Sequence, residues 1–259
     1  MDGSTLTITA LWRKQKCKFV QFLARRNYKM KPEKSGWWYW PPITIARYWV
    51  FQGILYMNWV ERMHRWTIEL LLLIGVYFIV SPFIRFPGNI FCSIFIAHTL
   101  SALLNGHLFA LLAHDLFWFS FYKDRRPFIN YIEKIRARLQ QKTPSCVCGV
   151  LFFGSLVRGN FRDSSDLDIR YISNDGVWNS LCTANWVFLE RVHALFAGFP
   201  IDIYMFRNID ELKKKINLNN EKPVSVYYHG GKLCRMLPDT VSFENFKQNF
   251  LSSSMGNDC

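Results

Sequence analysis

Apolar and polar residues are distributed in two different ways along this chain of 259 residues. Between residues 67 and 121 charged side chains are nearly absent, and only Glu69, Arg85 and Asp115 carry a charge there. From residue 122 onward, short apolar runs are separated by charged or turn-forming residues. The first pattern predicts helices in a membrane or in a deep core, and the second predicts a globular domain of strands and helices.

The apolar region contains two stretches, Leu70–Ile84 and Ile90–Trp118, separated by the turn-forming segment Arg85–Asn89. A membrane-spanning helix needs about 20 apolar residues. The second stretch is long enough, and the first is long enough only if residues 67–86 are counted. We therefore expect a two-helix membrane hairpin over residues 67–121. A buried helical hairpin and a re-entrant element are the alternatives.

Residues 1–66 combine basic and aromatic side chains. Tryptophan, tyrosine and arginine recur at helical intervals over residues 43–66, which predicts an amphipathic helix in the membrane interface. A third apolar helix packed on the hairpin is the other interpretation. The basic stretch Arg13–Lys34 is suited to anionic headgroups, or it forms a solvated arm.

The pattern of the C-terminal half predicts an α+β domain over residues 122–251, in which helices flank a small mixed sheet. Residues 252–259 are expected to form a disordered tail. The apolar patterns predict strands at Val147–Phe153, Leu167–Ile172 and Val224–Tyr228, and helices at Val177–Ala197 and Asp210–Ile216. The complete chain is then an α+β protein with a helical membrane region at its N-terminal side.

Candidate chemistry lies between the first two strands. Gly154-Ser155 directly follows the first strand and begins a turn and a short helix, whose backbone N–H groups and hydroxyl can bind phosphate. Asp166 and Asp168 stand one residue apart at the second strand, so their carboxylates point to the same face. Carboxylates together with phosphate oxygens are the ligands that Mg²⁺ prefers.

A third carboxylate, Asp202, lies in the apolar run Phe199–Phe206 after the predicted helix. A carboxylate in such a run is costly to bury unless it is paired or bound to a metal. An acid at the edge of a strand, paired with an arginine, is the alternative.

This segment resembles the signature of the polymerase β nucleotidyltransferase superfamily, at the spacing of its minimal members. The matching residues are Gly154, Ser155, Arg158, Gly159, Ser165, Asp166 and Asp168. The resemblance implies that Asp166, Asp168 and Asp202 are catalytic and bind two Mg²⁺ ions, with Mn²⁺ as an option. It also implies that Gly154, Ser155 and Arg158 bind the phosphates of a nucleoside triphosphate such as ATP.

The implied activity is transfer of a nucleoside monophosphate from Mg-NTP to a hydroxyl or phosphate acceptor. No stretch of the sequence identifies this acceptor or the oligomeric state, and a lipid-linked acceptor is one option. The competing hypothesis is a membrane module that binds nucleotide as a sensor without turnover. His98, His107 and His114 lie in the apolar region, where ionisable groups suggest function or hydrogen bonding between helices.

The net charge of +13 is concentrated beside the apolar region. Residues 1–66 hold twelve Lys or Arg and residues 123–142 hold seven, whereas the turn between the apolar stretches holds one. The positive-inside rule then predicts a multi-pass membrane protein with both termini and the catalytic domain in the cytoplasm. This placement of charge favours anionic lipid over nucleic acid as a partner. The seven cysteines form no metal-binding pattern and are expected to be reduced.

Overall fold

The computed structural model describes residues 40–105, 107–112, 124–162, 164–216, 222–228, 237 and 239–252. Contacts divide the chain into two compact units, residues 1–43 and residues 44–259. The second unit contains both the apolar hairpin and the sheet. The expected boundaries at residues 66 and 121 therefore do not coincide with this division.

The sheet has five strands in the order β3-β2-β1-β4-β5. They are β1 (Val147–Phe153), β2 (Leu167–Ser173), β3 (Ile201–Phe206), β4 (Val224–Tyr228) and β5 (Val241–Ser242). β1 is antiparallel to β2 and β4, whereas β2 and β3 are parallel and joined by the crossover helix α7 (Val177–Ala197). The α+β class and the predicted C-terminal elements are thus confirmed.

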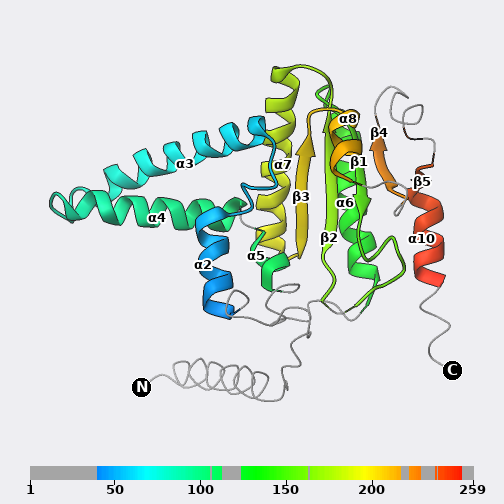
Figure 1. Cartoon of the computed structure of the whole chain (residues 1–259), viewed down its shortest axis with the longest axis horizontal. Coiled ribbons are helices and arrows are strands. Elements are labelled where there is room, and N and C mark those ends of the chain that lie inside the picture. The colour runs from blue at the N-terminus through cyan, green and yellow to red at the C-terminus, as the bar shows by residue number, and fades with distance from the viewer. Residues whose placement is uncertain are drawn as a thin grey trace, which may run out of the picture. The chain divides into compact units, whose positions relative to one another are not determined.

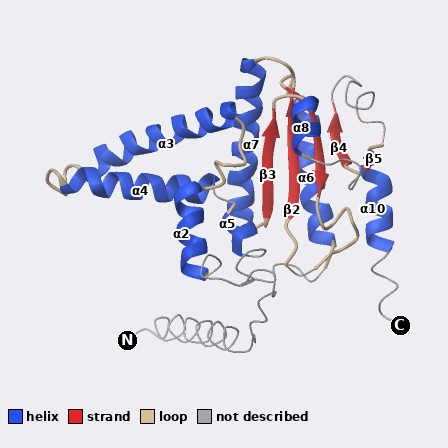
Figure 2. Ribbon diagram, in the orientation of Figure 1, coloured by secondary structure: helices blue, strands red, loops and turns tan. Residues whose placement is uncertain are grey.

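Helices cover both faces of this mixed sheet (Figures 1 and 2). α6 (Arg126–Lys142), α7 and α10 (Phe243–Ser252) share the larger apolar core with alternating residues of β1 and β2. α8 (Ile209–Lys215) packs in a second cluster with residues of opposite parity, such as Leu151 and Phe153. All seven residues of β1 are buried, as expected for a central strand covered on both faces.

The apolar hairpin consists of α3 (Trp59–Val80) and α4 (Gly88–Asn105), which pack side by side and extend away from the sheet (Figure 1). Both helices have the length and hydropathy of a membrane span, but only 11% and 28% of their apolar windows are buried. Leu71, Phe78 and Phe91 are 62–70% exposed. Within the described residues the structure therefore does not show the buried helical hairpin of the alternative.

The expected continuous helix over residues 43–66 is wrong. The structure has α2 (Pro41–Phe51), a turn, and then the start of α3. Gln52 and Gly53 have positive φ angles, which interrupt a right-handed helix. Asn58 then caps α3, since its side-chain oxygen accepts a hydrogen bond from the Glu61 N–H. Both signals are present in the sequence, but the regular spacing of the aromatic residues obscured them.

The second apolar stretch also ends earlier than expected. α4 stops at Asn105, and His107 adopts a left-handed conformation with φ 50° before the short helix α5 (Leu108–Ala110). A left-handed residue commonly follows the end of a helix, and Asn-Gly at positions 105 and 106 is a turn-forming pair in the sequence. A single helix over residues 90–118 is therefore excluded.

Polar side chains meet at the base of the hairpin. Glu69 of α3 accepts hydrogen bonds from His98 at 2.6 Å and from Ser101 at 3.2 Å, both on α4. Gln52 bonds the His98 carbonyl at 3.2 Å. For His98 and Ser101 the structure therefore shows hydrogen bonding between helices, which is the structural alternative to a functional role for polar groups in this region.

Cys146 and Cys182 form a disulfide that joins the start of β1 to α7, with Cα atoms 6.1 Å apart. The expectation of reduced thiols is thus wrong for this pair. Sequence separation concealed the contact, because only the packing of α7 on the sheet brings the two residues together. The basic segment 13–34, His114 and the tail after Ser252 lie outside the described residues, and Ser252 itself ends α10.

Candidate active site

The three predicted carboxylates lie at one cavity. Asp166 directly precedes β2, Asp168 is its second residue, and Asp202 is the second residue of β3. The parallel register places Asp168 opposite Asp202. The cavity has a volume of about 530 Å³, and all three residues line it. The pairing of β2 with β3 therefore brings Asp202 to the same cavity as Asp166 and Asp168, as the sequence predicted.

Gly154 follows β1 at a point where a side chain would not fit. Its φ angle is +91°, and a Cβ atom there would lie 2.0 Å from Oδ2 of Asp168. A glycine is therefore required for two independent reasons, the left-handed backbone and the close approach of the carboxylate. The backbone of this turn thus packs directly against one of the candidate catalytic groups.

The segment after Gly154 is a turn rather than the expected short helix. Its backbone hydrogen bonds have mixed spacing, from Arg158 N to Gly154 O and from Asn160 N to Ser155 O. Ser155 Oγ donates to Ser165 Oγ at 3.2 Å, next to Asp166. The serine is therefore held between the turn and the residues that lead into β2.

Arg158 does not line the carboxylate cavity. It lines a second cavity of about 430 Å³ together with Gly159, Lys222 and apolar residues of α10. The structure therefore brings Gly154 and Ser155 close to the carboxylates, but it places the Arg158 side chain at a different site.

Arg170 was missed by the sequence reasoning. It lies two residues after Asp168, on the same face of β2, and its Nη2 is 3.1 Å from Asp168 Oδ1 and 3.1 Å from Asp202 Oδ2. The period of two along a strand predicts this proximity, so the signal was present in Asp168-Ile169-Arg170. The guanidinium neutralises part of the negative charge of the site.

The pKa values of Asp168 and Asp202 shift in opposite directions. Burial raises the pKa of Asp168 to about 8, and the neighbouring charge of Asp166 adds to this effect. Burial also acts on Asp202, but the Arg170 guanidinium and His107 hold the pKa of Asp202 well below its usual range. Asp202 is thus the more acidic member of the pair, whereas burial favours the protonated form of Asp168.

His107, which follows the end of α4, reaches the site from the N-terminal helices. Its Nδ1 donates to Asp202 Oδ1 at 2.7 Å, and its ring packs against Tyr204 at a centroid distance of 4.9 Å. Burial lowers the pKa of His107, although the hydrogen bond to Asp202 opposes this shift. The left-handed conformation at residue 107 directs the imidazole toward β3.

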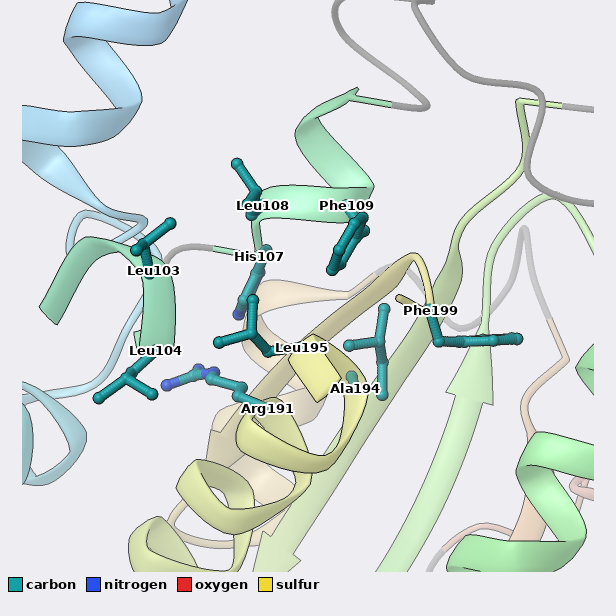
Figure 3. A pocket seen from close by; sticks show the side chains of 10 residues that line it. Leu103, Leu104, His107, Leu108, Phe109, Arg191, Ala194, Leu195 and Phe199 are labelled. Carbon is teal, nitrogen blue, oxygen red and sulfur yellow. The ribbon is translucent and has the colours of Figure 1, made fainter. Parts of the chain in front are cut away.

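A small cavity of about 10 Å³ lies behind His107 and is lined by Arg191 and by apolar residues of α4 and α7 (Figure 3). Within the described part of the chain, His107 Nε2 and Arg191 Nε are buried without a hydrogen-bond partner. The cavity is close to the smallest volume that holds one water molecule. Arg191 forms a buried ion pair with Glu61 of α3. Its Nη2 also donates a hydrogen bond to the Ile203 carbonyl oxygen at 2.6 Å.

The N-terminal helices also form one wall of the carboxylate cavity. Tyr48 of α2, Tyr56, His107 and Ala110 line it opposite residues of β2 and β3. Tyr204 and Lys215 add an aromatic ring and a cation to the lining. A molecule that occupies this cavity therefore touches both halves of the chain.

The donor chemistry at Asp166 and Asp168 fits Mg²⁺. Two carboxylates lie together at the cavity, and carboxylate oxygens are the ligands that Mg²⁺ prefers. Across the described residues, however, no three His, Cys, Asp or Glu side chains are grouped closely enough to hold one metal ion. Asp202 is therefore not grouped with the first two acids around a common ion position.

Comparison with known proteins agrees with this geometry. Residues 132–225 match the family described as "Nucleotidyltransferase domain", a range that runs from α6 to β4 and contains all three acids. A search of curated proteins finds no match to the chain. α2, α3 and α4 lie outside the matched range. The C-terminal half of this chain thus carries a nucleotidyltransferase domain.

Proposed function

We propose that the protein is a membrane-anchored enzyme that transfers a nucleoside monophosphate from Mg-NTP to an acceptor at the membrane surface. The observation that carries this proposal is the shared cavity. Asp166, Asp168 and Asp202 face Tyr48, Tyr56 and His107, which belong to the segments flanking the exposed apolar hairpin. The acceptor would therefore bind between the nucleotidyltransferase domain and the base of the hairpin.

The reaction follows from the chemistry of this domain. The acceptor oxygen forms a bond to the α-phosphorus, the bond from that phosphorus to the bridging oxygen breaks, and pyrophosphate leaves. When bound, Mg²⁺ neutralises charge on the triphosphate and makes the acceptor hydroxyl more acidic. Asp166 and Asp168 would hold this ion, and the turn at Gly154-Ser155 would bind phosphate oxygens. Asp202, kept ionised by Arg170 and oriented by His107, would accept the hydrogen bond of the attacking hydroxyl and then its proton, which passes on to solvent.

The test uses full-length protein in detergent, each labelled NTP in turn, and a total membrane lipid extract. Asp168→Ala is expected to abolish label transfer while the fold survives, because the Asp168 carboxylate would hold the Mg²⁺ ion that binds the triphosphate. Circular dichroism and thermal unfolding check the fold. Unchanged turnover in Asp168→Ala would refute the assignment. Label that appears only on a soluble compound or on protein would refute a lipid acceptor.

A nucleotide sensor without turnover is the second candidate, and Arg170 favours it. An arginine that pairs with two of the acids satisfies them without any metal ion. Stoichiometric nucleotide binding by the purified protein, with no transfer to any acceptor in a membrane extract, would support this function over the first.

Membrane attachment is proposed from α3 and α4. Large apolar side chains are exposed along both helices, among them Leu71, Phe78, Phe91 and Phe95, and insertion into lipid would remove them from water. Insertion as a hairpin keeps both ends of the pair on one side, which agrees with cytoplasmic termini.

Replacing Leu71 and Phe78 together by Asp is expected to release the protein from membranes. Each Asp costs about 3 kcal/mol at the centre of an inserted helix. Carbonate extraction and liposome flotation measure the release. Trp178→Asp is the control, because Trp178 is 83% exposed but lies on α7. Equal membrane retention of the double variant and the wild type would disprove insertion of the hairpin.

A further inference from the structure

Arg170 is fixed between two of the three acids by four hydrogen bonds. Its Nη2 donates to Asp168 Oδ1 and Asp202 Oδ2, each at 3.1 Å. Its Nη1 donates to the carbonyl oxygens of Asp202 at 2.8 Å and Ile169 at 3.0 Å. The guanidinium also lies over the Tyr204 ring, 5.3 Å from the ring centre. Strand register holds this arrangement, because Asp168 pairs with Asp202 and Arg170 pairs with Tyr204.

The other oxygen of Asp202 is engaged as well. His107 Nδ1 donates to Oδ1 at 2.7 Å, so each carboxylate oxygen of Asp202 accepts a hydrogen bond from a different side chain. Arginine remains protonated at any pH at which the protein is folded. The positive charge between Asp168 and Asp202 is therefore a permanent part of the site.

We propose that the guanidinium of Arg170 takes the place of one of the two divalent ions expected in such a centre, so that the site binds one ion, on Asp166 and Asp168. This inference rests on the proposed function and specifies how the site achieves it. An ion that bridges Asp168 and Asp202 needs an oxygen of each at about 2.1 Å. The guanidinium fills the position between these oxygens, and its charge repels a cation placed beside it.

Asp202 then contacts the acceptor hydroxyl and is not a metal ligand. Its carboxylate is fixed by Arg170 and His107, and it orients the acceptor hydroxyl. The geometry at Asp168 agrees with this division, because Arg170 engages Oδ1 whereas Oδ2 lies against the backbone of Gly154. The observation that no three acidic, histidine or cysteine side chains are grouped around one ion position, within the described residues, agrees as well.

The number of ions is measured by Mn²⁺ electron paramagnetic resonance on the full-length protein in detergent. The nucleotide is an NTP analogue with a methylene group between the α- and β-phosphates, which binds without turnover. We expect one Mn²⁺ per chain for wild type and two for Arg170→Met, since the neutral side chain leaves the second position open. Arg170→Lys, which keeps the charge, and Arg136→Met, which changes an arginine paired with Glu244 on the surface, should each bind one.

Two bound ions in the wild-type protein would overturn the inference, whatever the variants do. One ion in Arg170→Met would show that Arg170 does not exclude the second ion, which also overturns it. Asp202→Asn provides a test that does not depend on the folding of the Arg170 variants. It should still bind one ion, and loss of that ion would make Asp202 a ligand. A wild-type protein that binds neither ion nor nucleotide would refute the proposed function instead.

Discussion

At the residue scale, the site depends on how closely the turn after β1 approaches the acids. Gly154 leaves room for Oδ2 of Asp168, and Arg170 and His107 hold the two oxygens of Asp202. Each of these contacts joins residues from different elements. Small displacements should therefore affect chemistry more than stability.

Gly154→Ala tests the close approach. The new Cβ would lie 2.0 Å from Asp168 Oδ2, so the carboxylate must move. We expect kcat to fall by about 100-fold, the cost of misplacing a reacting group by about 1 Å. Gly159→Ala is the matched control, because Gly159 also has a positive φ angle of +73° but no atom lies within 4 Å of its added Cβ. Equal losses of kcat in both variants would show that backbone strain, and not the contact with Asp168, causes the effect.

At the element scale, α3 is joined to the sheet by a buried polar contact and does not merely precede it. Asn58 Nδ2 donates to Met205 O at 2.9 Å, and Met205 N donates to Glu61 Oε2 at 3.3 Å. Both groups belong to β3, which is the edge strand of the sheet. The start of α3 thus satisfies backbone groups at an edge that would otherwise be open to pairing with other chains.

The buried ion pair between Glu61 and Arg191 should be costly to break on one side. Arg191→Met is expected to lower the free energy of unfolding by about 3–5 kcal/mol, because Glu61 is then left buried without its partner. Urea titration in detergent measures the change. The exposed pair of Lys247 with Glu133 is the comparison, and Lys247→Met should lower the free energy of unfolding far less. Similar values for both variants would contradict the structural role of the buried pair.

At the scale of the whole molecule, residues 44–259 form one unit, in which the apolar hairpin and the nucleotidyltransferase domain share contacts. The hairpin is therefore more than a tether, since its base supplies part of the cavity wall and the hydrogen bond of His107 to Asp202. Membrane attachment and catalysis are expected to depend on the same packing.

A fragment that begins at residue 124 tests this unity. It retains the matched family range but lacks Asn58, Glu61 and His107. We expect it to be unstable or aggregated, because Arg191 loses its buried partner and the edge of β3 loses its cover. Expression followed by circular dichroism and size-exclusion chromatography gives the answer. A monomeric fragment with cooperative unfolding and full activity would show that the N-terminal helices are dispensable.

The sequence by itself determined those features that depend on local spacing. A continuous apolar run located β1, period-two alternation located β2, and helical spacing located α7, because these patterns are properties of consecutive residues. Asp166 and Asp168 were recognisable as a pair for the same reason. Arg170 follows the same period-two rule and could have been identified from the sequence.

The tertiary structure decided which distant segments meet. His107 and Asp202 are 95 residues apart, and Cys146 and Cys182 are 36 residues apart, so their contacts depend on the packing of helices against the sheet. The breaks at Gly53 and Asn105 were concealed by the apolar pattern around them. Packing also joined the hairpin to the catalytic domain, because buried charges such as Glu61 and Arg191 require partners that periodicity along one segment does not reveal.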